Sequence, residues 1–283
     1  QISQLLLQAP GWVAKLKGPS LKRDGKTDIS ELLCTVTQDH GQYTLSISKG
    51  SQLLKLGETT PYFRVSFQPY GQSQIAAYTR ATLLSTDPLE VYLEPMSIAP
   101  EQPYLPLSQP PAFAQWLWKN LGPFKTVGWA HDTSGLSAGV LSDAQFMREA
   151  LEGMRWFKKA VLALLSEPKD QLVIAVDTAV DRVSHMFYRE HQKADPNEIT
   201  KIHLIYEEMD QVIGAVVAVL RPSDTLVIMS DHGFGGFFRG FQLNRFLVDA
   251  GFLAIRKDTG AEFFADVDWA QSRAYALGTG SIF

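Results

Sequence analysis

Hydrophobic and polar residues alternate along the N-terminal third of the chain. Between residues 18 and 100, short runs at 43–47, 63–67 and 89–93 carry apolar side chains at every second position, with glycine and proline between the runs. A period of two is typical of antiparallel strands that bury one face. We therefore predict a β-rich module over residues 18–100, inserted in or appended to a larger domain, and a linker or short helix over residues 1–17.

A proline-rich connector at residues 95–111 ends this pattern, and the spacing of apolar residues then becomes helical. The helical spacing predicts helices over residues 111–122, 142–166, 196–220 and 242–250. Ser142 is a suitable N-cap for the second of these helices. The third helix is expected to bury one stripe of apolar residues: Ile199, Ile202, Tyr206, Met209, Ile213, Val217 and Leu220.

Two apolar runs lie between the predicted helices, at residues 170–176 and 225–229. A short apolar run bounded by polar residues is typical of a strand buried on both faces of a parallel sheet. The order strand, helix, strand over residues 171–230 indicates a βαβ crossover. We therefore predict an α/β fold over residues 101–283, with a mostly parallel sheet flanked by helices.

Each of these apolar runs is followed by an aspartate and a histidine. Asp231 and His232 come directly after the second run, whereas Asp181 and His185 follow the first run and are one helical turn apart. Asp and His side chains suit zinc or another first-row divalent metal, and the carboxyl ends of parallel strands are where open α/β sheets bind ligands. We predict that the four residues converge at neighbouring strand ends, with Asp177 as the alternative to Asp181. Each pair taken alone also fits a solvated surface pair.

The amino-acid composition of the chain argues against some classes of function. The 283 residues are 45% hydrophobic and 20% charged with a net charge of −4, which is typical of a globular chain and argues against nucleic acid as the main partner. No apolar stretch reaches membrane-spanning length. The single cysteine, Cys34, excludes an intrachain disulfide and leaves the redox compartment open. The triplet at residues 131–133 is interpreted as a polar loop.

Four segments resemble the type I phosphodiesterase/nucleotide pyrophosphatase-like branch of the alkaline phosphatase superfamily. They are DRVSHMF from Asp181, SDHGF from Ser230, LNRFL from Leu243 and DWAQSRAY from Asp268. The resemblance implies an alkaline phosphatase-like core and a hydrolase of phosphate diesters or nucleotide pyrophosphates, acting on a small phosphate-ester or nucleotide substrate. It also implies two divalent metal ions, zinc first with manganese or iron as alternatives, one held by Asp181 and His185 and the other by Asp231 and His232.

The resemblance also implies parts that we do not find in these 283 residues. They are an early strand ending in an Asp ligand, a Thr or Ser nucleophile, and a late His ligand. We assign no catalytic residue, and we expect the core at 101–283 to be truncated and residues 1–283 alone to bind metal weakly and be inactive. Two alternative functions remain. The first is a phosphomutase or phosphomonoesterase of the same superfamily, and the second is a non-catalytic phosphate- or metal-binding protein.

Overall fold

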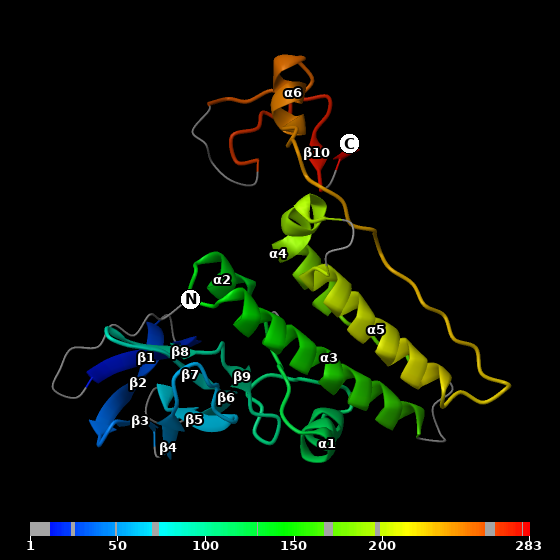
Figure 1. The fold of residues 1–283 in the computed structure, drawn as a ribbon. Coiled ribbons are helices and arrows are strands. Elements are labelled where there is room, and N and C mark those ends of the chain that lie inside the picture. Colours follow the sequence, from blue (N-terminus) through cyan, green and yellow to red (C-terminus); the bar gives the residue numbers. More distant parts are fainter. Residues whose placement is uncertain are drawn as a thin grey trace. The chain divides into compact units, whose positions relative to one another are not determined.

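The computed structural model describes most of the chain: residues 12–23, 26–48, 50–69, 74–128, 130–166, 172–195, 199–257, 264–278 and 280–283. The chain divides into two compact units, Gln1–Phe234 and Gly235–Phe283 (Figure 1). The four predicted metal ligands all belong to the first unit.

Antiparallel strands build the N-terminal part of the first unit. The first sheet has the order β1 (Trp12–Arg23), β2 (Lys26–Asp39), β3 (Gln42–Ile47) and β4 (Gly50–Leu54). A second sheet contains β5 (Phe63–Phe67), β6 (Ile75–Thr79) and β9 (Ser97–Ile98), and β7 (Ala81–Thr86) pairs with β8 (Leu89–Leu93). The antiparallel strands predicted at residues 43–47, 63–67 and 89–93 are therefore confirmed. Residues 12–17, for which a linker or short helix is predicted, belong to β1, and residues 1–11 lie outside the described residues.

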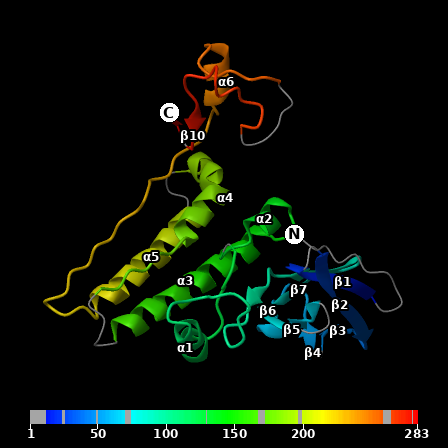
Figure 2. The same cartoon turned by 180° about the vertical axis from the view of Figure 1, so that it is seen from behind.

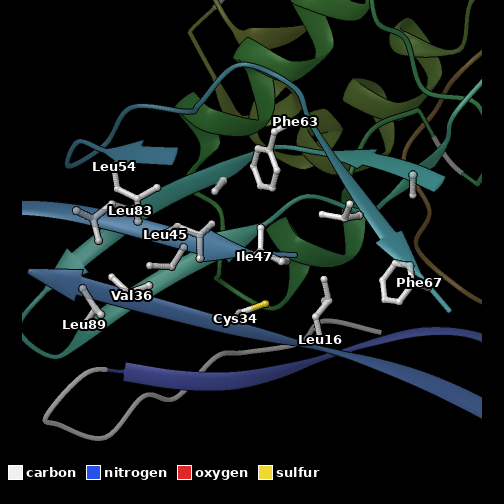
Figure 3. Close-up of a cluster of buried hydrophobic side chains, with 14 of the residues drawn as sticks. Leu16, Cys34, Val36, Leu45, Ile47, Leu54, Phe63, Phe67, Leu83 and Leu89 are labelled. Carbon is white, nitrogen blue, oxygen red and sulfur yellow. The ribbon is translucent and has the colours of Figure 1, made fainter. Parts of the chain in front are cut away.

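The inward-facing residues of these strands form one hydrophobic core. Figure 3 shows side chains from several strands meeting in it, among them Cys34, Val36, Leu45, Ile47 and Leu83, which are each at most 2% exposed. Successive strand residues point to opposite sheet faces, so alternation along the sequence places these apolar groups on one side. Their burial is the main favourable contribution to the stability of this part.

Helices make up the rest of the first unit. They are α1 (Ala112–Leu121), α2 (Thr133–Ser137), α3 (Asp143–Leu165), α4 (Ala179–Lys193) and α5 (Lys201–Val217). Both views show α3 and α5 running alongside each other (Figures 1 and 2). Residues from α3, α4 and α5 share a second hydrophobic core, which includes Phe146, Val183 and Ile205. The predicted helices at 111–122 and 142–166 are confirmed, with Ser142 as the N-cap of α3.

The third predicted helix begins later than expected and buries a different stripe. Helix α5 starts at Lys201 after the N-cap Thr200, whereas the predicted start near Pro196 lies outside the described residues. Its buried residues are Ile202, Ile205, Val212 and Val216. Tyr206 and Val217 from the predicted stripe are 53% and 55% exposed. Apolar residues occur on both sides of α5, and packing against α3 and α4 decides which side is buried.

The predicted mostly parallel sheet flanked by helices is wrong. Every pair of named strands in the described part of the chain is antiparallel, and the strands form several small sheets. Residues 172–176 and 225–229 belong to no helix or strand, and residues 170 and 171 lie outside the described residues. Ile174 is 79% exposed and Met229 is 84% exposed, so the expected βαβ crossover is not formed. A parallel strand needs hydrogen-bonding neighbours and cover on both faces, and an apolar run does not reveal whether such partners exist.

The second unit is small. It contains α6 (Leu243–Asp249) and the antiparallel pair β10 (Ala276–Leu277) and β11 (Ser281–Ile282). Leu247, Leu253, Val267 and Ala276 form its core. The predicted helix at 242–250 is confirmed, and Gly251 follows it with a φ of 73°, which glycine adopts without strain. None of the helices among the described residues is long and apolar enough to cross a bilayer.

Candidate metal centre

Helix α4 carries the first half of the candidate centre. Asp181 and His185 are one turn apart, so their side chains lie on the same face, with 3.4 Å between Asp181 Oδ1 and His185 Nε2. Asp177 Oδ1 accepts a hydrogen bond of 2.7 Å from the Ala179 N–H at the start of α4. Burial raises the pKa of the Asp177 carboxyl, and this hydrogen bond opposes the shift. Asp177 therefore stabilises the helix start, and Asp181 stays the predicted ligand with Asp177 as its alternative.

The segment Ser230–Phe234 carries the second half. His232 Nε2 lies 3.9 Å from Asp181 Oδ1 and 3.7 Å from Asp231 Oδ2. The structure thus brings Asp181, His185 and His232 together, and Asp231 joins the group through His232. The prediction that these residues sit at the ends of parallel strands is wrong, because the strands are not formed and the residues come from a helix and an irregular segment.

The ring of His232 is oriented by its neighbour. His232 Nδ1 lies 2.8 Å from the Gly233 carbonyl oxygen, so Nδ1 carries the proton and donates. In the neutral imidazole this leaves the lone pair on Nε2, the atom that faces Asp181. The hydrogen bond to Gly233 and the nearby carboxylates of Asp231 and Asp181 raise the pKa of His232. The Ser230 hydroxyl donates to the His232 carbonyl and closes the turn.

The carboxylate of Asp181 shows whether a cation would fit between these side chains. Its Oδ1 atom is buried and accepts no hydrogen bond from any described residue, although two imidazole Nε2 atoms lie within 4 Å. Ligand atoms of a tetrahedral zinc ion, each about 2.0–2.1 Å from the metal, lie about 3.3 Å from one another. The spacing of 3.4 Å from His185 Nε2 is close to this value, and that of 3.9 Å from His232 Nε2 is larger. Among the described residues, no three His, Cys, Asp or Glu side chains converge closely enough to hold a metal ion.

Two aromatic residues at the centre were not anticipated from the sequence. The Phe234 ring lies 4.9 Å from the His185 ring and 5.0 Å from the Tyr188 ring. Tyr188 follows Asp181 by seven residues and shares its face of α4, and Phe234 directly follows the Asp-His-Gly segment. The helical spacing could therefore have predicted that Tyr188 lies on the same face as Asp181. The contact of Phe234 with α4 could not be predicted from the sequence and is seen only in the structure.

Comparison with known proteins agrees with the motifs. No match was found among curated proteins or among solved structures. The family model for type I phosphodiesterase / nucleotide pyrophosphatase matches residues 115–278, which is more than half of the 283 residues and contains the whole candidate centre. This chain therefore belongs to the type I phosphodiesterase / nucleotide pyrophosphatase family of hydrolases.

Proposed function

We propose that this protein is a metal-dependent hydrolase of phosphate diesters or nucleotide pyrophosphates that uses two divalent metal ions. Zinc is the first candidate, with manganese or iron as alternatives. The observation that carries the proposal is the buried Oδ1 atom of Asp181, which lacks a hydrogen-bond donor and faces the Nε2 atoms of His185 and His232. The Arg182 guanidinium lies 3.6 Å from the other oxygen, Asp181 Oδ2, but a buried Oδ1 atom that accepts no hydrogen bond is still costly, and a cation between these groups would offset that cost.

Each half of the centre has a defined role in this proposal. Asp181 and His185 would hold one cation from α4, and Asp231 and His232 would hold the other from the segment after α5. The carboxylates reduce the net charge of the two bound metal ions, and each imidazole binds its ion through a neutral nitrogen. The Gly233 carbonyl keeps the proton of His232 on Nδ1, which leaves Nε2 available as a ligand. The bound ions would supply Lewis-acid polarisation of the phosphoryl oxygens.

The exposure of the centre supports a small soluble substrate. The side chains of His185 and His232 are each 57% exposed, and that of Asp231 is 89% exposed. A phosphate ester can therefore reach the ligands directly from solvent, without opening of the hydrophobic core. None of the described residues is assigned as a nucleophile.

Metal binding provides the first test. Zn²⁺ and Mn²⁺ are titrated calorimetrically into the wild-type chain and into Asp181→Ala, His185→Ala, Asp231→Ala and His232→Ala. We expect each substitution to weaken binding, by about 100-fold for Asp181→Ala, because a lost ligand costs at least as much as a lost outer-shell partner. His40→Asn is the matched control: Asp39 and His40 form another adjacent Asp-His pair, and Asn tolerates the φ of 47° at residue 40.

Turnover then separates the reaction classes. The same proteins are assayed with bis-p-nitrophenyl phosphate and with p-nitrophenyl phosphate in the presence of each metal. We expect residues 1–283 alone to hydrolyse either ester poorly or not at all, because no nucleophile is assigned in them, and the metal titration then carries the test. Hydrolysis of the diester that is faster than that of the monoester, lost in Asp181→Ala and kept in His40→Asn, supports the proposal. Faster hydrolysis of the monoester favours a phosphomonoesterase. Metal binding that none of the four substitutions weakens contradicts the assignment of the centre.

A further inference from the structure

The two halves of the candidate centre belong to segments that are far apart in sequence. Contacts between these segments are needed to hold the two halves next to each other. Asp181 and His185 are fixed on a regular helix, whereas Asp231 and His232 lie in an irregular segment. Residues 225–230, which lead into that segment, belong to no helix or strand and are exposed. Local bonds within residues 230–233 shape the turn but do not attach it to α4. Besides the 3.9 Å approach of His232 Nε2 to Asp181 Oδ1, a further attachment is needed to fix this segment against α4.

Phe234 provides contacts of the required kind. Its ring meets the His185 ring edge to face, with 4.9 Å between centroids and an interplanar angle of 88°. It also packs 5.0 Å from the ring of Tyr188, whose hydroxyl donates a long hydrogen bond of 3.4 Å to the Phe234 carbonyl oxygen. His185 and Tyr188 are three residues apart on α4, so the ring of Phe234 contacts two adjacent side chains of one helix face.

We propose that Phe234 and Tyr188 are positioning residues that hold the Asp231–His232 segment against α4 and set the ring plane of His185. Phe234 comes two residues after His232, so its attachment limits how far His232 can move from Asp181. Metal-bound histidines are usually oriented by a hydrogen bond to their second ring nitrogen. Here the edge-to-face contact of Phe234 orients His185 by packing instead. This inference rests on the proposed metal-binding function.

The first test measures Zn²⁺ affinity by competition with a chromophoric chelator. Phe234→Ala and Tyr188→Ala are each expected to weaken binding by about 10- to 100-fold, the range for outer-shell residues of metal sites. The double variant is expected to be no weaker than either single variant, because the two residues share one contact. Phe234→Tyr keeps the ring and should stay within about threefold of wild type. Phe238→Ala is the matched control. Phe238 is four residues from Phe234 and 84% exposed, so this variant should bind Zn²⁺ as tightly as wild type. Far-UV circular dichroism checks that each variant is folded.

The second test needs no metal. The ring current of Phe234 should displace the His185 Cε1–H resonance in a carbon–proton correlation spectrum, and His185→Gln identifies that resonance by its loss. In Phe234→Ala the resonance should move towards the position of an exposed histidine, and in Phe238→Ala it should not move.

The outcomes separate this inference from the proposed function. If wild type binds Zn²⁺ and Phe234→Ala changes neither the affinity nor the resonance, the positioning role is overturned while the proposed function stands. If the wild-type chain binds no Zn²⁺, the proposed function fails and the positioning role fails with it, whatever the resonance does. A resonance shift together with weaker binding in Phe234→Ala, rescued in Phe234→Tyr, supports the inference.

Discussion

Two histidines of this chain show how burial decides what a residue does. His131 is 3% exposed and packs against the Phe146 ring, and burial lowers its pKa to about 4. His232 is largely exposed and its pKa is raised by a backbone hydrogen bond. The sequence predicts a polar loop at residues 131–133, but Asp132 accepts hydrogen bonds from the Tyr92 hydroxyl and the Gly135 N–H. That triplet therefore contributes to packing and to the start of α2.

The buried His131 predicts a pH dependence of stability. Its folded pKa of about 4 lies below the ordinary value of 6.5, mainly through burial and also through the charges of Lys125 and Arg182. The unfolded chain thus takes up the proton first as the pH falls, so the free energy of unfolding should be fully present above pH 6.5 and decrease towards pH 4. The decrease attributable to His131 should reach about 3 kcal/mol.

The measurement is urea denaturation of wild type and His131→Phe between pH 4 and pH 8. A phenyl ring does not titrate, and it loses no hydrogen bond at Nδ1, which has no partner among the described residues. The difference in stability between the two proteins should therefore shrink or reverse at low pH. His40→Asn serves as the control for an exposed histidine. Parallel pH curves for wild type and His131→Phe would refute the assignment.

Among the elements, α3 follows its sequence signals closely. The Ser142 hydroxyl accepts a hydrogen bond from the Gln145 N–H, and the Gln145 side chain accepts one from the Ser142 N–H, which completes a capping box. Phe146, Ala150 and Met154 then repeat on the buried face of the helix. Both signals act within a few residues, so they are readable before the fold is known.

The cap gives a prediction about the stability of α3. Ser142→Ala removes the acceptor for a helix N–H and should lower the free energy of unfolding by about 1 kcal/mol. Ser142→Asp keeps an acceptor at the same position and should be close to wild type. Chemical denaturation followed by circular dichroism measures both variants. Equal losses in Ser142→Ala and Ser142→Asp would show that the hydroxyl does not act as a cap.

Within the first unit, a group of charges that is buried except for Glu152 connects the strands with the helices. Arg80 and Lys125 pair with Glu94 at 2.8 and 2.7 Å, and with Glu152 and Glu149 of α3 at 2.7 and 3.1 Å, respectively. Burial alone lowers the pKa of Lys125, but the Glu94 and Glu149 carboxylates outweigh it and raise the pKa above its ordinary value. The division of the chain into residues 18–100 and 101–283 remains a prediction, and this cluster is a contact across that boundary.

Removing one member of this cluster should cost much more than removing a surface charge. Lys125→Met leaves Glu94 and Glu149 buried without their shared cation and should lower the free energy of unfolding by about 3 kcal/mol. Lys15→Met breaks the exposed pair with Glu31 and should cost less than about 1 kcal/mol. Denaturant titration of both variants at neutral pH measures the two losses. Similar small losses for both would show that Lys125 is dispensable for stability.

The sequence by itself determined the locally encoded features of this protein. Period-two runs specified antiparallel strands such as β3 and β5, and the Ser142 cap specified the start of α3. The segments from Asp181 and Ser230 indicated the family, which the match over residues 115–278 establishes. Each of these depends on neighbours along the chain, so no long-range contact is needed to recognise it. The metal role of the four ligands is still a prediction.

Only the tertiary structure decided how distant segments pair. The runs at 172–176 and 225–229 have the composition of buried parallel strands, yet both are exposed and unpaired with any described strand. The contact between Asp181 and His232, and the packing of Phe234 on α4, join residues about 50 positions apart. The pattern of side chains along a segment shows which face the segment can bury. Which other segment covers that face depends on long-range packing, and a local pattern does not encode long-range packing.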